Sequence, residues 1–275
     1  MVNIWLGMLA LLVLAFIVLL VKGIREDKEV DRIWRSLEST PSHERFTPEM
    51  VSALPPPARR YFLHAIAPGT PLASSVHLKM RGTFRLKEDA EWMQMQAEEI
   101  IAVLKGFVWK ATIQQGFFKM VGADSYANQS LYMRFSLWGI IPLVNAKSPD
   151  IAKSAIARLA LESIWLPSAL LPQHGVSWEM VDDSRVKASL KIDGEPITLT
   201  LVVDTEGRLL EVSMLRWSDQ AERGVFSYIP CGGTVQAEQT FGGFTIPSQM
   251  SAGYWFGTER YWNFFRATIE SAQFS

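Results

Sequence analysis

The stretch VHLKMRGTFRL, residues 76–86, has apolar side chains at even-numbered positions and polar ones at odd-numbered positions, and only Gly82 lacks a side chain in the apolar row. This period of two residues is typical of a β-strand with one buried face and one wet face. More β-rich runs lie further along the chain, on both sides of one helical segment. They cover residues 92–103, 106–114, 117–126, 131–144, 177–182, 185–192, 197–204, 209–217, 225–239, 244–255 and 261–273.

Short turns connect most of these runs. Asp193-Gly194 and Glu206-Gly207 have the composition of hairpin turns, which join antiparallel neighbours. About ten antiparallel strands make a sheet that is too large to stay flat. The sequence therefore predicts an α+β fold with a strongly curved antiparallel sheet, or incomplete barrel.

One helix is predicted between the strands. Ser148 is a natural N-cap, Pro149 suits the first helical position, and the helix is expected to end near Leu166, before Pro167. A helix that is apolar on most sides must be buried on more than one side, so we expect it in or across the concave side of the sheet. Its polar side chains form a single stripe at i, i+4 spacing: Asp150, Ser154, Arg158 and Glu162.

The N-terminus is an apolar segment. The first charged side chain is Lys22, and about twenty apolar residues in a helix span the roughly 30 Å hydrocarbon core of a bilayer. A cleaved secretory signal is disfavoured, because no basic residue precedes the run and no small-residue cleavage site follows it. A buried core helix is the least favoured interpretation. We expect residues 1–24 to be a transmembrane anchor.

Behind the anchor, we expect a juxtamembrane helix and proline-rich linker at residues 25–57 and the curved-sheet domain at residues 58–275. Trp34, on the apolar side of the juxtamembrane helix, is expected either at the lipid interface or against the domain. Five basic residues at positions 22–35 favour a single-pass protein of the cell membrane with its domain in the cytoplasm. The lone cysteine, Cys231, excludes only internal disulfides, so an exterior location stays open.

The composition of the chain limits the classes of function that it can have. The chain is 48% hydrophobic and 20% charged, as expected for an ordinary folded domain. A formal net charge of −1 argues against nucleic-acid binding, because recognition of phosphates needs a marked basic excess. The chain has no His-Glu-x-x-His motif, no CxxC motif and no phosphate-cradling glycine loop, so no metal and no cofactor are expected.

Short motifs follow one another in order along residues 47–272. They include Arg81-Gly82-Thr83-Phe84-Arg85, Gly106-Phe107-Val108-Trp109-Lys110-Ala111, Arg158-x-x-x-Glu162, Trp178-Glu179-x-x-Asp182-Asp183, Arg216 and Tyr261-Trp262. As a series they resemble an uncharacterised bacterial domain-of-unknown-function family of membrane-anchored proteins. That family is similar in fold to the lipoprotein-localisation carriers, in which a curved antiparallel sheet wraps helices around a hydrophobic cavity. The resemblance implies a fold and suggests a hydrophobic ligand, and it brings no assigned activity.

The candidate ligand-binding residues are Trp109, Trp138, Arg158, Glu162 and Trp165. Aromatic side chains either fill a large sheet core or line a hydrophobic pocket. A buried Arg158 is expected to pair with Glu162 and to recruit Asp150, Ser154 or a strand residue, because an isolated buried charge is costly. The alternative is that Arg158 offers a fixed cation to an acidic headgroup.

No catalytic residue is assigned. The chain has no Gly-x-Ser-x-Gly elbow, and its four histidines lie in separate predicted elements. The best candidate set for hydrolysis is His174 with the nearby Ser168 and Asp182.

The favoured function is therefore a non-enzymatic binder of lipid or another hydrophobic ligand, held at the lipid bilayer of a membrane. The alternatives are a membrane-tethered protein-interaction scaffold with a solid core, and a hydrolase that acts on an apolar substrate.

Overall fold

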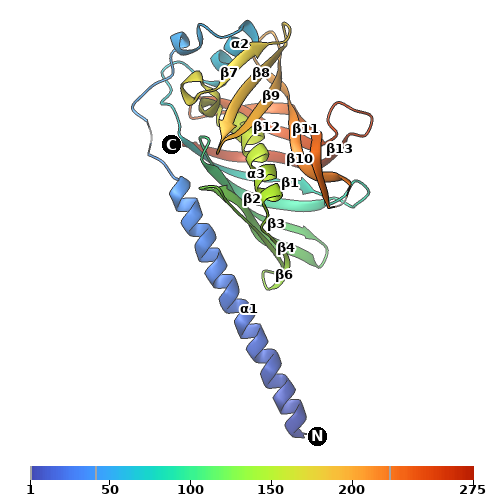
Figure 1. The fold of residues 1–275 in the computed structure, drawn as a ribbon. Coiled ribbons are helices and arrows are strands. Elements are labelled where there is room, and N and C mark those ends of the chain that lie inside the picture. The colour runs from blue at the N-terminus through green and yellow to red at the C-terminus, as the bar shows by residue number, and fades with distance from the viewer. Residues whose placement is uncertain (1, 41, 223) are drawn as a thin grey trace.

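The computed structural model (Figure 1) describes residues 2–40, 42–222 and 224–275, and these form one antiparallel sheet of 13 strands with three α-helices. The strands are β1 (Ser75–Phe84), β2 (Met93–Ala102), β3 (Gly106–Gln115), β4 (Phe118–Ala127), β5 (Ser130–Leu137), β6 (Ile141–Ala146), β7 (Ser177–Met180), β8 (Arg185–Ile192), β9 (Glu195–Val203), β10 (Leu209–Glu222), β11 (Val225–Phe241), β12 (Phe244–Tyr254) and β13 (Trp262–Phe274). The helices are α1 (Val2–Leu37), α2 (Pro56–Ala65) and α3 (Pro149–Glu162), with 3₁₀ segments η1 (Pro48–Val51), η2 (Ser163–Trp165), η3 (Pro167–Leu170) and η4 (Pro172–His174).

The sheet consists of two antiparallel meanders, β1–β6 and β7–β13, which pair with each other in the middle of the sheet through β1 and β13. Its strand order is β6-β5-β4-β3-β2-β1-β13-β12-β11-β10-β9-β8-β7. The chain therefore runs outward from β1 to the edge strand β6, crosses to the other edge at β7 through α3 and the 3₁₀ segments, and returns until β13 pairs with β1. Among the described residues the edges β6 and β7 do not pair, so the sheet is not closed. The predicted α+β fold with an incomplete barrel is confirmed.

The strand count exceeds the predicted ten or so. One reason is that residues 131–144, predicted as a single strand, form the separate strands β5 and β6. Trp138 and Gly139 between them have φ values of 52° and 75°, and a strand cannot continue through two such residues. The turn predicted at Asp193-Gly194 is observed, and both residues have positive φ, as a type I′ hairpin requires.

Helix α3 lies against the sheet and contacts strands from both of its halves, including β4, β5, β9 and β10 (Figure 1). We call this side of the sheet the inner face. The predicted N-cap is observed, since the Ser148 side chain accepts a hydrogen bond from the Ile151 backbone N–H at 3.2 Å. The α-helix ends at Glu162, and η2 continues the segment to Trp165, one residue short of the expected end.

The C-terminal part of α1 packs on the opposite, outer face. Val30 and Leu37 are buried there in a small apolar cluster with side chains of β2, β3 and β4. Trp34 lies edge-on to His77, with ring centroids 5.0 Å apart, and the Lys110 ammonium lies 4.7 Å from the Trp34 ring centroid. Trp34 therefore packs against the domain. Because α1 is continuous from Val2 to Leu37, the boundary expected near residue 24 falls inside one helix.

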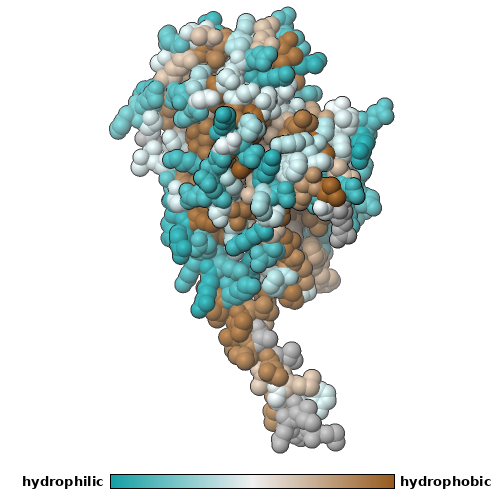
Figure 2. Space-filling model, in the orientation of Figure 1, coloured by the Kyte–Doolittle hydropathy of each residue, from teal (hydrophilic) through white to brown (hydrophobic). Residues whose placement is uncertain are grey.

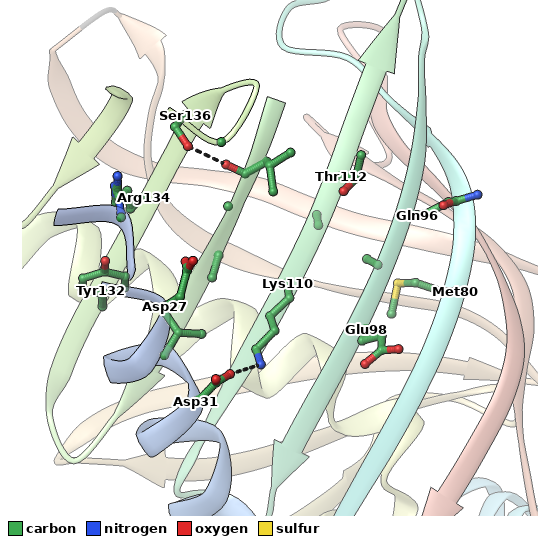
Figure 3. A pocket seen from close by; sticks show the side chains of 18 of the residues that line it. Asp27, Asp31, Met80, Gln96, Glu98, Lys110, Thr112, Tyr132, Arg134 and Ser136 are labelled. Carbon is green, nitrogen blue, oxygen red and sulfur yellow. Dashed lines mark hydrogen bonds and ion pairs between the residues drawn. The ribbon is translucent and has the colours of Figure 1, made fainter. Parts of the chain in front are cut away.

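A groove of about 640 Å³ lies between α1 and the outer face (Figure 3). Two ion pairs connect its walls: Lys110 Nζ lies 2.6 Å from Asp31 Oδ1, and Arg134 pairs with Glu26. These contacts and the apolar cluster fix the direction in which α1 leaves the sheet. Its N-terminal part extends away from the domain with exposed apolar side chains (Figures 1 and 2).

Candidate ligand-binding site

A cavity of about 610 Å³ lies between α3 and the inner face of the sheet. Most of the side chains around it are apolar, and they come from both halves of the sheet as well as from α3 and η2. They include Phe84, Trp109, Ile113, Met120, Phe135, Leu161, Trp165, Val212, Met250, Ala252, Trp262 and Phe264. A volume of this size is within the roughly 300–1,000 Å³ that is usual for small-molecule sites. The inner face is therefore not packed solid.

The mouth of the cavity lies at one end of the sheet. Three exposed apolar residues line it: Leu86 after β1, Phe118 at the start of β4, and Leu143 on β6. Gln220, near the end of β10, is exposed at the same end. A ligand can therefore enter past the turns that join β1 to β2, β3 to β4 and β5 to β6.

A charged cluster lies on the inner face. Arg158 donates hydrogen bonds to Glu162 at 2.6 Å, to Asp124 of β4 at 2.8 Å and to Glu99 of β2 at 3.0 Å. The Arg158 guanidinium carbon also lies 4.5 Å from the ring centroid of Phe107. Each of the three guanidinium nitrogens of Arg158 therefore donates to a carboxyl group, which commits this side chain to holding α3 on the sheet.

Burial shifts the pKa values of these three carboxyl groups. It raises the pKa of Glu99 well above its ordinary value, and the nearby charge of Glu162 raises it further. Burial also raises the pKa of Asp124 and of Glu162, although the Arg158 guanidinium opposes the shift. A buried carboxyl group that holds a proton avoids the cost of an uncompensated charge, and the upward shift is greatest for Glu99. We infer that Glu99 carries such a proton.

Stability is expected to fall as pH rises, because native Glu99 holds its proton above the roughly pH 4.3 at which an unfolded Glu loses it. The stabilisation is complete below that pH and is lost as the pH rises through the native pKa. Glu99→Gln keeps the size of a neutral, protonated Glu99 side chain and removes the titration. Chemical denaturation of the full chain in mild detergent, between about pH 5 and pH 8, should show a flatter profile for this variant and higher stability at the alkaline end. Glu98→Gln, on the exposed outer face, is the control, and equal slopes for wild type and Glu99→Gln would contradict the assignment.

Arg216 is a second cation on the inner face. Its Nε donates to Ser154 Oγ of α3 at 3.1 Å, and its guanidinium carbon lies 5.9 Å from the Tyr254 ring centroid. Among the described residues it has no carboxylate within ion-pair distance, whereas Arg158 has three. Arg216 and Tyr254 both line the cavity. Arg85 lines the cavity as well and forms no ion pair with a described residue, but it donates to the backbone carbonyls of Asn263 and Glu88. Arg216 is therefore the cation better placed to face a ligand.

The predicted site residues divide into two groups. Trp109, Arg158, Glu162 and Trp165 line the cavity, and the Trp165 indole N–H donates to the Pro247 carbonyl at 3.1 Å. Trp138 lies elsewhere, in the turn between β5 and β6, with 55% of its surface exposed. Its indole N–H donates to the backbone carbonyl of Phe117 at 2.9 Å.

Sequence reasoning did not assign Glu99, Asp124 or Arg216 to the site. Two of them carried a signal, because each occupies the buried row of an alternating strand. Glu99 follows Met95 and Ala97 on β2, and Arg216 follows Val212 and Met214 on β10. The stripe residues Asp150 and Ser154 do not join Arg158, since they bind Trp217 and Arg216 instead.

The candidate hydrolase set is not assembled in the part of the chain that the structure describes. The Ser168 hydroxyl is buried and donates to the Ala73 carbonyl at 2.5 Å. Asp182 accepts backbone hydrogen bonds from Ser184 and Arg185 within its own turn. His174 bonds neither residue, and burial lowers its pKa. No nucleophile and base lie within hydrogen-bond reach in this set.

Three comparisons place the chain among known proteins. No curated protein matches it. Solved structures similar to it include a LolA superfamily protein from Nitrosomonas europaea, with 8% identity, 80% of this chain and 92% of that chain covered and a TM-score of 0.41. A putative outer membrane lipoprotein-sorting protein domain from Vibrio parahaemolyticus has 8% identity, coverages of 73% and 85% and a TM-score of 0.38. A DUF1329 family protein from Desulfovibrio piger has 9% identity, coverages of 74% and 86% and a TM-score of 0.41.

A protein-family model matches residues 52–274, which is most of the chain and agrees with the extent of the predicted resemblance. The chain therefore belongs to DUF6920, a family of unknown function.

Proposed function

We propose that this protein is a single-pass membrane-anchored binder of a lipid or another hydrophobic ligand, which occupies the cavity between α3 and the inner face. The observation that carries the proposal is the cavity itself, with its apolar lining and its open mouth. A solid-core scaffold would have packed this volume, because protein interiors are close-packed. The hydrolase alternative has no assembled catalytic set among the described residues to support it.

The anchor part of the proposal rests on α1. Among the described residues it is the one helix that is long and apolar enough to cross a membrane, and its described apolar side chains between Trp5 and Val21 are exposed, apart from the half-buried Leu19. A bilayer would cover them, whereas water would not. The basic flank favours a cytoplasmic domain by the positive-inside rule, and a reporter fused after Ser275 tests that orientation.

Native mass spectrometry of the purified full chain, together with extraction and analysis of its lipids, tests the binding part of the proposal. We expect an apolar ligand in near-stoichiometric amount, and binding of a fluorescent fatty acid after the ligand is stripped. Repeated preparations that contain no apolar ligand and do not bind the probe would refute it.

Arg216 narrows the ligand chemistry to an amphiphile with an anionic end. A guanidinium in an apolar cavity is attracted to a carboxylate or phosphate, and a hydrogen bond to a charged group contributes about 1.5–3 kcal/mol. Arg216→Met should therefore weaken oleate binding by about tenfold to a hundredfold and leave binding of oleyl alcohol, which has the same chain without the charge, nearly unchanged. Titration with both probes measures the difference.

The matched control is Arg81→Met. Arg81 lies on the outer face, where it forms an exposed ion pair with Glu270 at 2.9 Å, so its loss should affect neither probe. If Arg216→Met weakens both probes equally, Arg216 supports the shape of the cavity and does not bind an anionic group.

A further inference from the structure

Large apolar side chains are exposed together at one end of the sheet. Phe117, in the turn between β3 and β4, is 96% exposed, and Trp138, in the turn between β5 and β6, is 55% exposed. The hydrogen bond from the Trp138 indole to the Phe117 carbonyl ties the two turns together. With the partly or largely exposed Phe118, Ile141 and Leu143 they form what we call the apolar rim. Soluble monomers seldom leave such a patch without a partner.

The apolar rim lies where α1 leaves the domain. Gly23 of α1 faces Arg134 and the carbonyl of Gly139, which is the residue directly after Trp138. The ion pair between Glu26 and Arg134 holds α1 at this position. Figure 1 shows α1 continuing past the ends of β4 and β6, and Figure 2 shows hydrophobic side chains at this end of the domain, beside the emerging helix.

The apolar rim and the end of the apolar segment of α1 therefore lie at the same level along the axis of α1. Lys22 is the first charged residue of the chain, so the apolar segment of α1 ends at Val21, two residues before Gly23 and close to the level of the rim. The docked part of α1 fixes this relation, because the same continuous helix both packs on the outer face and carries the apolar segment. A bilayer that covers the segment reaches the rim.

We propose that the apolar rim inserts into the interfacial layer of the bilayer that α1 spans, so that the mouth of the cavity opens directly onto lipid. The inference rests on the membrane anchor proposed above. Tryptophan and other aromatic side chains are favoured at the membrane–water interface, and the exposed Lys119 beside Phe118 adds attraction to lipid phosphates.

This arrangement gives the ligand an entry route. Phe118 and Leu143 belong both to the apolar rim and to the lining of the cavity mouth. An acyl chain can therefore pass from the bilayer to the cavity along apolar side chains, without exposure to water. The arrangement also assigns a role to Trp138, which lies outside the cavity.

Site-specific labelling of the full chain in phosphatidylcholine vesicles tests the insertion. In a Cys231→Ala background, Phe117→Cys carries an environment-sensitive fluorophore, and Leu210→Cys, exposed at the opposite end of the sheet, is the matched control. We expect the label at 117 to shift to the blue and to be quenched by lipids brominated on their acyl chains, and the label at 210 to do neither. Equal quenching at the two positions in chains held by the bilayer overturns the inference.

Resistance of the vesicle-bound chain to alkaline carbonate separates this outcome from failure of the anchor. A chain that washes off refutes the anchor. For a chain that washes off, the fluorescence measured before the wash decides about the rim. Quenching of the label at 117 would show that the rim inserts into lipid without the anchor. Absence of quenching would refute insertion of the rim as well.

Phe117→Ser tests the entry route with little risk to the fold, because the side chain is almost fully exposed. We expect slower transfer of a fluorescent fatty acid from vesicles to the protein, with unchanged equilibrium binding. Leu210→Ser is the control, and an unchanged transfer rate for Phe117→Ser would show that the ligand enters by another path.

Discussion

Arg158→Met is expected to lower the free energy of unfolding by about 3–5 kcal/mol, because removing one partner of a buried ion cluster leaves the opposite charges uncompensated. Arg158 is the shared partner of three carboxylates, and the Glu99 side chain among them is only 1% exposed. The protonated Glu99 tolerates burial, but Asp124 and Glu162 then have only Arg216 nearby to offset their charge. Methionine fills similar space, so the loss is mainly electrostatic.

Chemical denaturation of the full chain in mild detergent measures this loss. Lys153→Met is the control on the same helix, where the ion pair with Glu195 at 3.5 Å and the contacts with the Trp217 and Tyr228 rings should together contribute only about 1–2 kcal/mol. Adding Asp124→Asn and Glu162→Gln to Arg158→Met should recover part of the stability, since the uncompensated charges are then gone. A loss for Arg158→Met as small as that of the control would mean that the cluster does not hold α3.

The same variant also separates the two roles that the sequence left open for Arg158. If the folded fraction binds ligand as well as wild type does, Arg158 is purely structural. The observed geometry favours this result, because every guanidinium nitrogen of Arg158 already donates to a carboxyl group of the protein.

The fold was largely predictable because its signals are local. Alternation within residues 76–86 identifies a half-buried strand without reference to any other residue, and Asp193-Gly194 specifies its own turn. The prediction of a single strand over residues 131–144 was wrong, and the cause is also local. Gly139 permits the break, but an isolated glycine in an apolar run is equally consistent with a bulge, so the turn was missed.

The site was less predictable because its residues are distant in sequence. Arg158 and Glu162 are four residues apart and are visible on one helix, whereas Asp124 and Glu99 are 34 and 59 residues from Arg158. Alternation along β2 places Glu99 on the buried row but does not say what it meets there. Only the curvature of the sheet around α3 brings Glu99 to Arg158, and that curvature is a property of the whole sheet.

Ala252→Trp is expected to weaken ligand binding by more than tenfold and to leave the fold intact. Ala252 lines the cavity from β12, between Met250 and Tyr254 on the inner row and opposite Phe265 of β13. A tryptophan side chain buries about 150–250 Å² of its own surface and would occupy space that an acyl chain needs. Because the indole enters an open cavity and not a filled core, the usual cost of overpacking should be small.

A graded series makes this result specific to volume. Ala252→Leu should weaken binding less than Ala252→Trp, while Leu215→Trp, on the exposed outward row of β10, should not weaken it at all. Titration with a fluorescent fatty acid gives the affinities, and thermal unfolding reports whether each variant is folded. Because added bulk excludes both charged and neutral probes, Ala252→Trp should reduce oleate and oleyl alcohol binding together, whereas Arg216→Met reduces only the first. If a folded Ala252→Trp protein binds both probes as wild type does, the ligand does not occupy this cavity.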